Sequence, residues 1–252
     1  MIKNLKIIEE ATSSSDLAKD EILNNRNKFD AFFVYEQTKG RGTLNKEWIS
    51  HKGNLHLSII VKPKKPLLEW KFISIISAVA IRRSLIKLYG HLDTLLKFKW
   101  PNDFIINNKK IGGILLETIP RSNTLVIGMG LNLVFNPNNI KNGWPSENIK
   151  NINGINIDPI KLSYLIIDNL NLLIEDWENN NFFNVFSEWK SNLCFLGEQI
   201  HSFGFNKKYC GIFEDVGSKG QMFLKTKNNK IIEFSSGTFV PKFMIDKYVT
   251  CN

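Results

Sequence analysis

The sequence predicts an α+β protein in which a large domain of antiparallel strands and helices is followed by a small β-barrel. Three patterns indicate this class. Apolar segments between residues 95 and 134 follow one another without a helical segment, which favours antiparallel pairing over a doubly wound sheet. Regions of helical periodicity at 67–88 and 162–189 flank them. After Leu193, short β segments alternate with turn residues.

Length and composition agree with this organisation. The chain has 252 residues, 43% of them hydrophobic, which is enough for a real core. No apolar run reaches the roughly 18 residues of a membrane-spanning helix, so we expect no membrane partner. Residues 1–10 lack the apolar region of a signal peptide. Three cysteines without C-x-x-C spacing argue against a disulfide framework or zinc site and fit a reducing cytoplasm.

The net charge of +9 leaves two interpretations open. One is an anionic partner, such as nucleic acid or an acidic carrier protein. The other is a solvated surface on which lysines are spread evenly. No helix-turn-helix pattern precedes the first glycine-rich motif, so we expect no specific nucleic-acid partner.

Local patterns predict the elements of the first half in order. Residues 5–10 favour a strand, and the serines at 13–15 offer N-cap oxygens for a helix running to about residue 25. Residues 31–36 are typical of a buried strand, 37–50 of a polar loop, and 54–62 of a strand rich in β-branched residues. Prolines 63 and 66 end that strand. Apolar positions at helical spacing then predict a long core helix over 67–88.

The second half begins with strands at 95–100 and 104–107, which flank Pro101-Asn102-Asp103. Segments 111–119 and 125–134 complete a meander, and helices are expected at 162–177 and 182–189. Short strands at 199–203, 209–215, 221–225 and 231–234 predict a barrel of about 50 residues. We therefore expect two domains, 1–192 and 193–252.

The first motif with chemical potential is Lys39-Gly40-Arg41-Gly42-Thr43, which continues to Trp48. Two glycines let the backbone approach a ligand closely, and Arg41 can hold a carboxylate or phosphate with two parallel hydrogen bonds. The motif matches neither a Walker loop nor a dinucleotide fingerprint. A plain surface hairpin is the alternative.

The second motif is Lys97-Phe98-Lys99-Trp100-Pro101-Asn102-Asp103. Strand alternation places both lysines on the face opposite Phe98. A lysine fixed at a strand end suits the negative charge that develops when a carboxylate attacks phosphorus. The alternative is an edge strand with solvated lysines.

Two glycine-containing strands form the last motifs. One is Lys110-Ile111-Gly112-Gly113, in which two glycines leave an apolar strand without side chains. Such glycines indicate either that another group approaches the strand closely or that the strand bulges. In Gly128-Met129-Gly130-Leu131-Asn132, small residues at alternate positions could clear space for a flat ring such as adenine. A crowded core is the alternative.

The order and spacing of these motifs resemble the biotin–protein ligase family, from about residue 5 to 240, and K-W-P-N-D is the most specific part. The resemblance implies the class II aminoacyl-tRNA synthetase-like mixed sheet with helices, followed by an SH3-like barrel. It implies a ligase-only type, without the DNA-binding domain of some members, acting as a monomer or a homodimer. The partner would be a biotin carboxyl carrier protein, of acetyl-CoA carboxylase or another biotin-dependent carboxylase.

The implied reaction joins biotin to ATP as biotinyl-5′-AMP with Mg²⁺ present, and then transfers biotin to a carrier lysine. Lys99 and Arg41 would be catalytic. Biotin would be bound by Ser13, Ser14, Ser15, Gln37, Gly40, Arg41, Gly42, Thr43, His56, Lys99 and Gly113. The nucleotide would be bound by Trp48, Asn102, Lys110 and Asn132, and Asp103 is the candidate magnesium ligand.

The chain departs from the family at three places. Thr43 stands where the family has a second arginine, so we expect weaker retention of biotinyl-AMP unless Lys46 supplies that charge. Three serines at 13–15 replace Ser-Thr-Asn, and His56 stands where tyrosine is common. Alternative functions are a lipoate–protein ligase or octanoyltransferase of the same fold, a non-catalytic nucleic-acid binder, and a ligase that binds biotin but turns over poorly.

Overall fold

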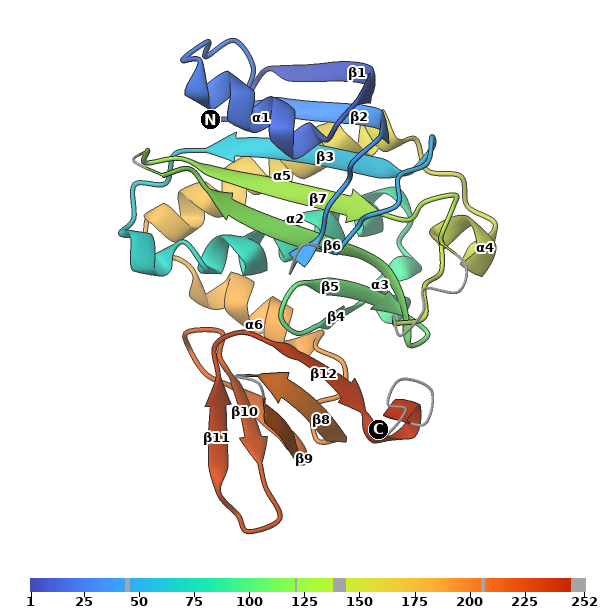
Figure 1. Ribbon diagram of the computed structural model, residues 1–252, viewed down its shortest axis with the longest axis vertical. Helices are drawn as coiled ribbons and strands as arrows, with labels where there is room; N and C mark the ends of the chain where they lie inside the picture. Colours follow the sequence, from blue (N-terminus) through green and yellow to red (C-terminus); the bar gives the residue numbers. More distant parts are fainter. Residues whose placement is uncertain (44–45, 121, 138–143, 205–206, 246–252) are drawn as a thin grey trace.

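A computed structural model of the chain describes residues 1–43, 46–120, 122–137, 144–204 and 207–245. Seven strands form one sheet in the order β1-β2-β3-β7-β6-β5-β4 (Figure 1). Their bounds are Leu5–Ala11 (β1), Ala31–Gln37 (β2), Leu55–Val61 (β3), Lys97–Lys99 (β4), Asp103–Ile106 (β5), Lys109–Thr118 (β6) and Leu125–Leu131 (β7). The strands predicted before residue 134 are therefore confirmed, except that the one expected over 95–100 is only Lys97–Lys99, because residue 95 ends a short helix.

The pairing of the strands makes this a mixed sheet. β1 and β2 are parallel, whereas the other neighbours pair antiparallel. Parallel neighbours need a crossover connection, and α1 (Ser14–Leu23) lies in the one between β1 and β2. The antiparallel pairing predicted for residues 95–134 is confirmed in β4 to β7.

Two long helices, α2 (Phe72–Leu88) and α5 (Pro159–Glu178), cover one face of the sheet, and α6 (Phe183–Ser191) follows them (Figure 1). The helix predicted from residue 67 begins only at Phe72. Leu67 and Leu68 lie in a separate 3-10 turn and are 65% and 87% exposed, so they do not belong to the buried stripe of α2. Two short helices, α3 (Leu92–Leu95) and α4 (Ile149–Asn153), were not predicted.

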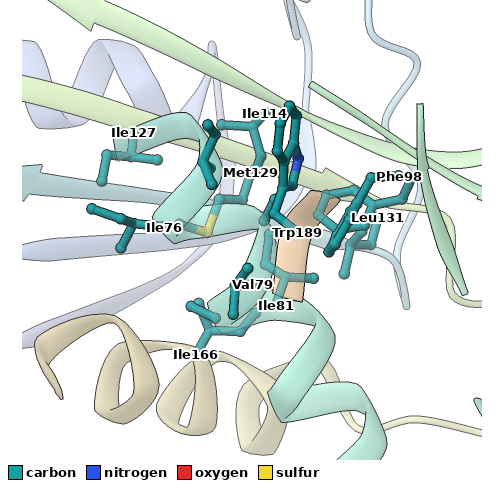
Figure 2. Packing of buried hydrophobic residues seen from close by; sticks show 14 of the residues in the cluster. Ile76, Val79, Ile81, Phe98, Ile114, Ile127, Met129, Leu131, Ile166 and Trp189 are labelled. Atoms are coloured by element: carbon teal, nitrogen blue, oxygen red, sulfur yellow. The ribbon is translucent and has the colours of Figure 1, made fainter. Parts of the chain in front are cut away.

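The main core lies between the sheet and these helices. Figure 2 shows Ile127, Met129 and Leu131 of β7 on the side of Ile76 and Val79 of α2. Strand alternation turns the residues between them, Gly128 and Gly130, to the opposite face. That face carries α1 and a smaller apolar cluster of Ala18, Phe32, Ile119 and Val126. One face of the sheet is thus filled by core, and the other has room beside α1.

The C-terminal part is a five-stranded antiparallel sheet in the order β11-β10-β9-β8-β12, below α6 in Figure 1. The bounds are Gln199–Gly204 (β8), Lys207–Val216 (β9), Met222–Lys225 (β10), Ile231–Phe234 (β11) and Thr238–Pro241 (β12). The four predicted strands are confirmed, and β12 is additional. Among the described residues β11 and β12 do not pair, so the expected barrel is not closed there.

The predicted division at residues 192 and 193 falls between α6 and β8 and stays a prediction. The apolar core is continuous across that point, because Phe213, Leu224 and Phe239 belong to the same cluster as Ile76 and Leu131. The two sheets therefore share one buried interior.

Candidate active site

A cleft of about 520 Å³, including its open mouth, lies beside α1 on the face of the large sheet that the main core does not use. Its lining residues come from several segments between residues 13 and 130. It is lined by Ser13, Ser14, Ser15, Gln37, Arg41, Gly42, Thr43, Trp48, Asn102, Asp103, Lys110, Gly113, Ile114, Leu115, Gly128, Met129 and Gly130. Twelve of the residues expected to bind ligands are in this lining, and they come from the serines at 13–15, from Gln37 and from the first three motifs.

The serines at the N-terminus of α1 form one end of the cleft. Ser13 caps the helix by accepting a hydrogen bond at 3.0 Å from the backbone N–H three residues on. Ser14 donates to Oε1 of Gln37 from its N–H at 2.8 Å and from its hydroxyl at 3.1 Å. The Ser58 hydroxyl on β3 lies 2.8 Å from that of Ser14 and 3.0 Å from that of Ser15. This end presents hydroxyl and amide groups that suit a small polar ring.

Glycines form the floor of the other end. Gly113 of β6 lies directly opposite Gly130 of β7, so no side chain stands above the sheet there. The Trp48 indole rests on this floor, since a Cβ on Gly130 would lie 2.7 Å from two of its ring carbons. A flat surface between a tryptophan and a bare strand is suited to a planar group such as a nucleobase.

The loop between β2 and β3 places Trp48 over the floor. It folds back on itself, because Gly42 N–H donates to the Lys46 carbonyl at 2.7 Å and Trp48 N–H donates to the Gly40 carbonyl at 2.9 Å. A Cβ on Gly40 would lie 2.4 Å from the Trp48 carbonyl oxygen, so this close approach requires glycine. The G-R-G motif is thus a small hairpin that forms a wall of the cleft.

Arg41 enters the cleft held by acidic partners. Its guanidinium lies 2.7 Å from Asp16 and 3.3 Å from Glu117, and it donates to the Ser13 hydroxyl at 3.1 Å. Burial alone would lower the Arg41 pKa, but hydrogen bonds and charge from Glu117 and Asp16 outweigh it and raise the pKa. Arg41 is therefore a permanent cation.

A second cation stands at the glycine floor. Lys110 of β6 lies 2.6 Å from Oδ1 of Asp103, and Lys99 of β4 lies 3.7 Å from Oδ2 of the same carboxylate. Burial raises the Asp103 pKa, but the charges of Lys110 and Lys99 outweigh this effect, so the pKa is lowered and the group stays ionised. Lys46 also lowers it, which places the charge of that loop lysine within reach of the cleft.

Lys99 and Lys110 differ in what they face. Lys110 lines the cleft, and its side chain is 28% exposed. Lys99 is 3% exposed, and its ammonium lies 4.8 Å from the ring centres of both Trp144 and Phe239. Lys99 lies on the strand face opposite Phe98, as predicted. The alternative prediction of a solvated lysine is wrong, because the side chain is buried. Lys99 itself does not line the cleft.

Three other expected ligand residues lie outside the lining. Gly40 contributes only its backbone, which accepts a hydrogen bond from Trp48 within the hairpin. His56 is 1% exposed, and burial lowers its pKa to about 4, so it is neutral at physiological pH. Asn132 is 3% exposed and donates to the Glu147 carbonyl at 3.2 Å. Each is adjacent to the cleft but covered.

Three buried polar atoms without a hydrogen-bond partner lie near the glycine floor. They are Nε1 of Trp48, Nε2 of His56 and Oδ1 of Asn132. His56 lies directly opposite Gly130 on the neighbouring strand, so it borders the floor. Buried polar groups are normally satisfied, and unsatisfied groups beside a cleft are candidates for ligand contacts.

Five lining residues were missing from the expected set: Ile114, Leu115, Gly128, Met129 and Gly130. The signal for Gly128 and Gly130 was present in the G-M-G motif, whose alternate small residues predict an open floor. Ile114, Leu115 and Met129 carry no sequence signal, because apolar residues in buried strands usually belong to the core.

Asp103 does not fit a metal ion held by the chain. It is the one carboxylate among the described residues of the lining, and two lysine ammonium groups occupy its oxygens. The described residues hold no group of three His, Cys, Asp or Glu side chains placed for a metal. A magnesium ion in this cleft would have to arrive on the phosphates of a nucleotide.

Comparisons with known proteins agree with this geometry. The Biotin/lipoate A/B protein ligase family matches residues 8–133, and the chain belongs to this family of ligases. The bifunctional ligase/repressor BirA of Bacillus spizizenii is 26% identical over 232 residues, covering 88% of this chain and 69% of that protein. The biotin–[acetyl-CoA-carboxylase] ligase of Paracoccus denitrificans is 27% identical over 196 residues, covering 75% and 81%.

Solved structures show the same fold. The biotin protein ligase of Aquifex aeolicus, in complex with biotin and ATP, superposes with a TM-score of 0.79 over 95% of this chain and 99% of that one, at 23% identity. The mixed sheet with helices, followed by a small β domain, that the resemblance implied is therefore confirmed. Within the described part of the chain, no helix has both the length and the apolar character needed to span a bilayer.

Proposed function

We propose that this chain is a biotin–protein ligase that uses ATP to attach biotin to a lysine of a biotin carboxyl carrier protein. The observation that carries the proposal is the division of one cleft into a polar serine end and a flat glycine end, with Arg41 and Lys110 as its cations. The names of the relatives in Bacillus and Paracoccus, both ligases, support it. The Paracoccus name supports acetyl-CoA carboxylase as the source of the carrier.

In the first step, an oxygen of the biotin carboxylate attacks the α-phosphorus of ATP. A new O–P bond forms, the bond to the β-phosphate breaks, and pyrophosphate leaves. Ser14, Ser15 and Gln37 would hold the biotin ring, and Trp48 would cover adenine on the glycine floor. Lys110 would offset the charge that grows on the phosphate, since fixed cations aimed at developing charge are effective catalysts.

In the second step, the amine of a carrier lysine attacks the carbonyl carbon of biotinyl-AMP. An amide forms, AMP leaves with the electrons of the C–O bond, and the amine loses a proton. Arg41 would retain the adenylate until the carrier arrives. Its contacts with Glu117 and Asp16 support this role, because a guanidinium that binds carboxylates can also bind a phosphate.

The reducing cytoplasm remains the expected compartment. Cys194 and Cys210 are both free thiols, and burial raises the Cys194 pKa to about 12, which keeps that thiol protonated and unreactive.

The test is transfer of labelled biotin, with ATP and magnesium, to a purified biotin carboxyl carrier domain. We expect transfer by the unmodified chain and a loss of roughly 100-fold in Lys110→Ala, the scale of removing one fixed charge from a transition state. Transfer of lipoate or octanoate in preference to biotin would support the alternative function within the family. Salt-sensitive binding to nucleic acid without adenylation would support the non-catalytic alternative.

A further inference from the structure

Lys99 is a buried lysine whose surroundings come from distant parts of the chain. Burial lowers its pKa, and the charge of Asp103 opposes that effect. The Lys99 ammonium lies 4.8 Å from the ring centre of Trp144, which precedes α4, and 4.8 Å from the ring centre of Phe239 in β12. Aromatic faces attract cations, and they do so more strongly away from water. Two rings and one carboxylate thus enclose a group that the cleft does not reach.

The position of Lys99 in the sheet relates it to the cleft. Lys99 lies opposite Asp103, Asp103 opposite Gly113, and Gly113 opposite Gly130, so these four residues form one row across β4, β5, β6 and β7. Residues directly opposite one another in a sheet project from the same face. Lys99 is therefore at the covered end of the row that forms the floor of the cleft.

Asp103 connects the two lysines. Its Oδ2 faces Lys99 at 3.7 Å and its Oδ1 faces Lys110 at 2.6 Å. A carboxylate shared between two cations has its orientation set by both, because turning towards one means leaving the other. Without Lys99, one oxygen of this buried carboxylate would lose its charged partner, and the side chain would be free to turn.

The C-terminal sheet holds the strand that carries Lys99. The Trp100 indole donates to the carbonyl of Gly220, in the turn between β9 and β10, at 2.9 Å. The Phe98 carbonyl accepts from the Cys194 N–H at 2.9 Å, and Phe98 N–H donates to the Asn192 carbonyl at 2.9 Å. The residues on either side of Lys99 are thus fixed by the segment that leads into the small sheet and by the sheet itself.

We propose that Lys99 is a positioning residue: held by Trp144 and Phe239, it orients the Asp103 carboxylate, which in turn holds the Lys110 ammonium at the reacting end of the cleft. The small C-terminal sheet contributes to catalysis through Phe239, without lining the cleft. This inference rests on the proposed ligase function.

The test compares Lys99→Met with Lys97→Met in biotin-dependent exchange between ATP and pyrophosphate. Lys97 is a matched control, because it lies two residues away on the same strand and donates to Asn192 rather than to Asp103. We expect Lys99→Met to lower kcat about 10- to 100-fold, which corresponds to about 1.4–2.7 kcal/mol of transition-state stabilisation, with the biotin dissociation constant nearly unchanged. Lys97→Met should change kcat by less than about 3-fold.

A double-mutant cycle separates positioning from a general loss of structure. In an Asp103→Asn background, Lys99→Met should lower kcat by less than about 3-fold further, because the two residues act through one another. Phe239→Leu, which keeps an apolar side chain but removes the aromatic face, should lower kcat in the same direction as Lys99→Met. Additive losses in the cycle, or normal kcat in Lys99→Met, would overturn the inference.

A crystal structure of Lys99→Met gives a result that does not depend on activity. We expect the Asp103 carboxylate to be turned and its contact with Lys110 lost. An unchanged contact would overturn the inference even if the chain used a different substrate. Absence of biotin-dependent exchange in the unmodified chain would instead count against the proposed function alone.

Discussion

At the scale of single residues, burial decides what each ionisable group can do. Lys110 and Lys99 touch the same carboxylate, yet only Lys110 reaches the cleft. Arg41 forms ion pairs with Asp16 and Glu117, and a bound anion could replace these partners. His56 lies beside the floor of the cleft as a neutral imidazole, with Nδ1 near the Val34 carbonyl at 3.1 Å.

The buried imidazole of His56 predicts a loss of stability in acid. Its pKa falls from 6.5 in the unfolded chain to about 4, mainly through burial. Stability from this group is therefore fully present above pH 6.5 and is lost as the pH falls towards 4. Between pH 7 and 4.5 the loss should be on the order of 2 kcal/mol, and His56→Phe should remove it.

Urea unfolding at the two pH values measures this difference. An equal pH dependence in His56→Phe and the unmodified chain would show that His56 does not titrate as inferred.

At the scale of elements, the alternating sequence of β7 places large residues on the core face of the sheet and glycines on the cleft face. Its large residues, Ile127, Met129 and Leu131, are buried in the main core (Figure 2). The glycines between them form the floor of the cleft. The two glycines face different ends of that cleft. A Cβ on Gly128 would lie 3.0 Å from the Ser15 hydroxyl, whereas one on Gly130 would meet the Trp48 ring.

This arrangement predicts that the two glycines control different ligands. Gly130→Ala should displace Trp48 and weaken ATP binding about 10-fold or more, with biotin affinity nearly retained. Gly128→Ala, the matched control, should weaken biotin binding more than ATP binding, because it crowds the serine end. Calorimetric titration of each variant with each ligand measures this. Loss of the same ligand in both variants would contradict the assignment of the two ends.

At the scale of the whole molecule, one core joins the two sheets. Phe213 and Leu224 of the small sheet belong to the same buried cluster as the residues between α2 and β7. Lys190 of α6 also lies 2.8 Å from Asp215 of β9. A continuous interior of this kind favours unfolding as one cooperative unit.

Leu224→Ala tests that cooperativity. Leu224 is fully buried, so the substitution should cost about 2–4 kcal/mol through lost contacts and a cavity. If the core is shared, urea unfolding should remain a single transition, shifted to lower urea for probes in both sheets. A separate early transition of the small sheet, with the large sheet unaffected, would show that the two parts unfold independently.

Much of the fold follows from local patterns. The strands before residue 134 were predictable because alternation and β-branched residues are local properties, and α5 was predictable from its apolar spacing. The start of α2 and the strand β12 were not. Leu67 and Leu68 have the composition of a helix but are exposed, and β12 is only four residues long and ends in a proline. The parallel pairing of β1 with β2 depends on where α1 packs, which no local pattern contains.

The sequence alone determined the family-specific motifs, their order and most of the cleft lining, because those residues occupy neighbouring strands whose spacing carries the chemistry. The tertiary structure decided which cation serves the cleft. Lys99 and Lys110 both flank Asp103, and a sequence cannot tell which of two lysines beside one carboxylate will be covered. Trp144 and Phe239, distant in the chain, enclose Lys99 and leave Lys110 at the open end. Burial is a property of the packed molecule, and it separates a buried charge from one that can meet a substrate.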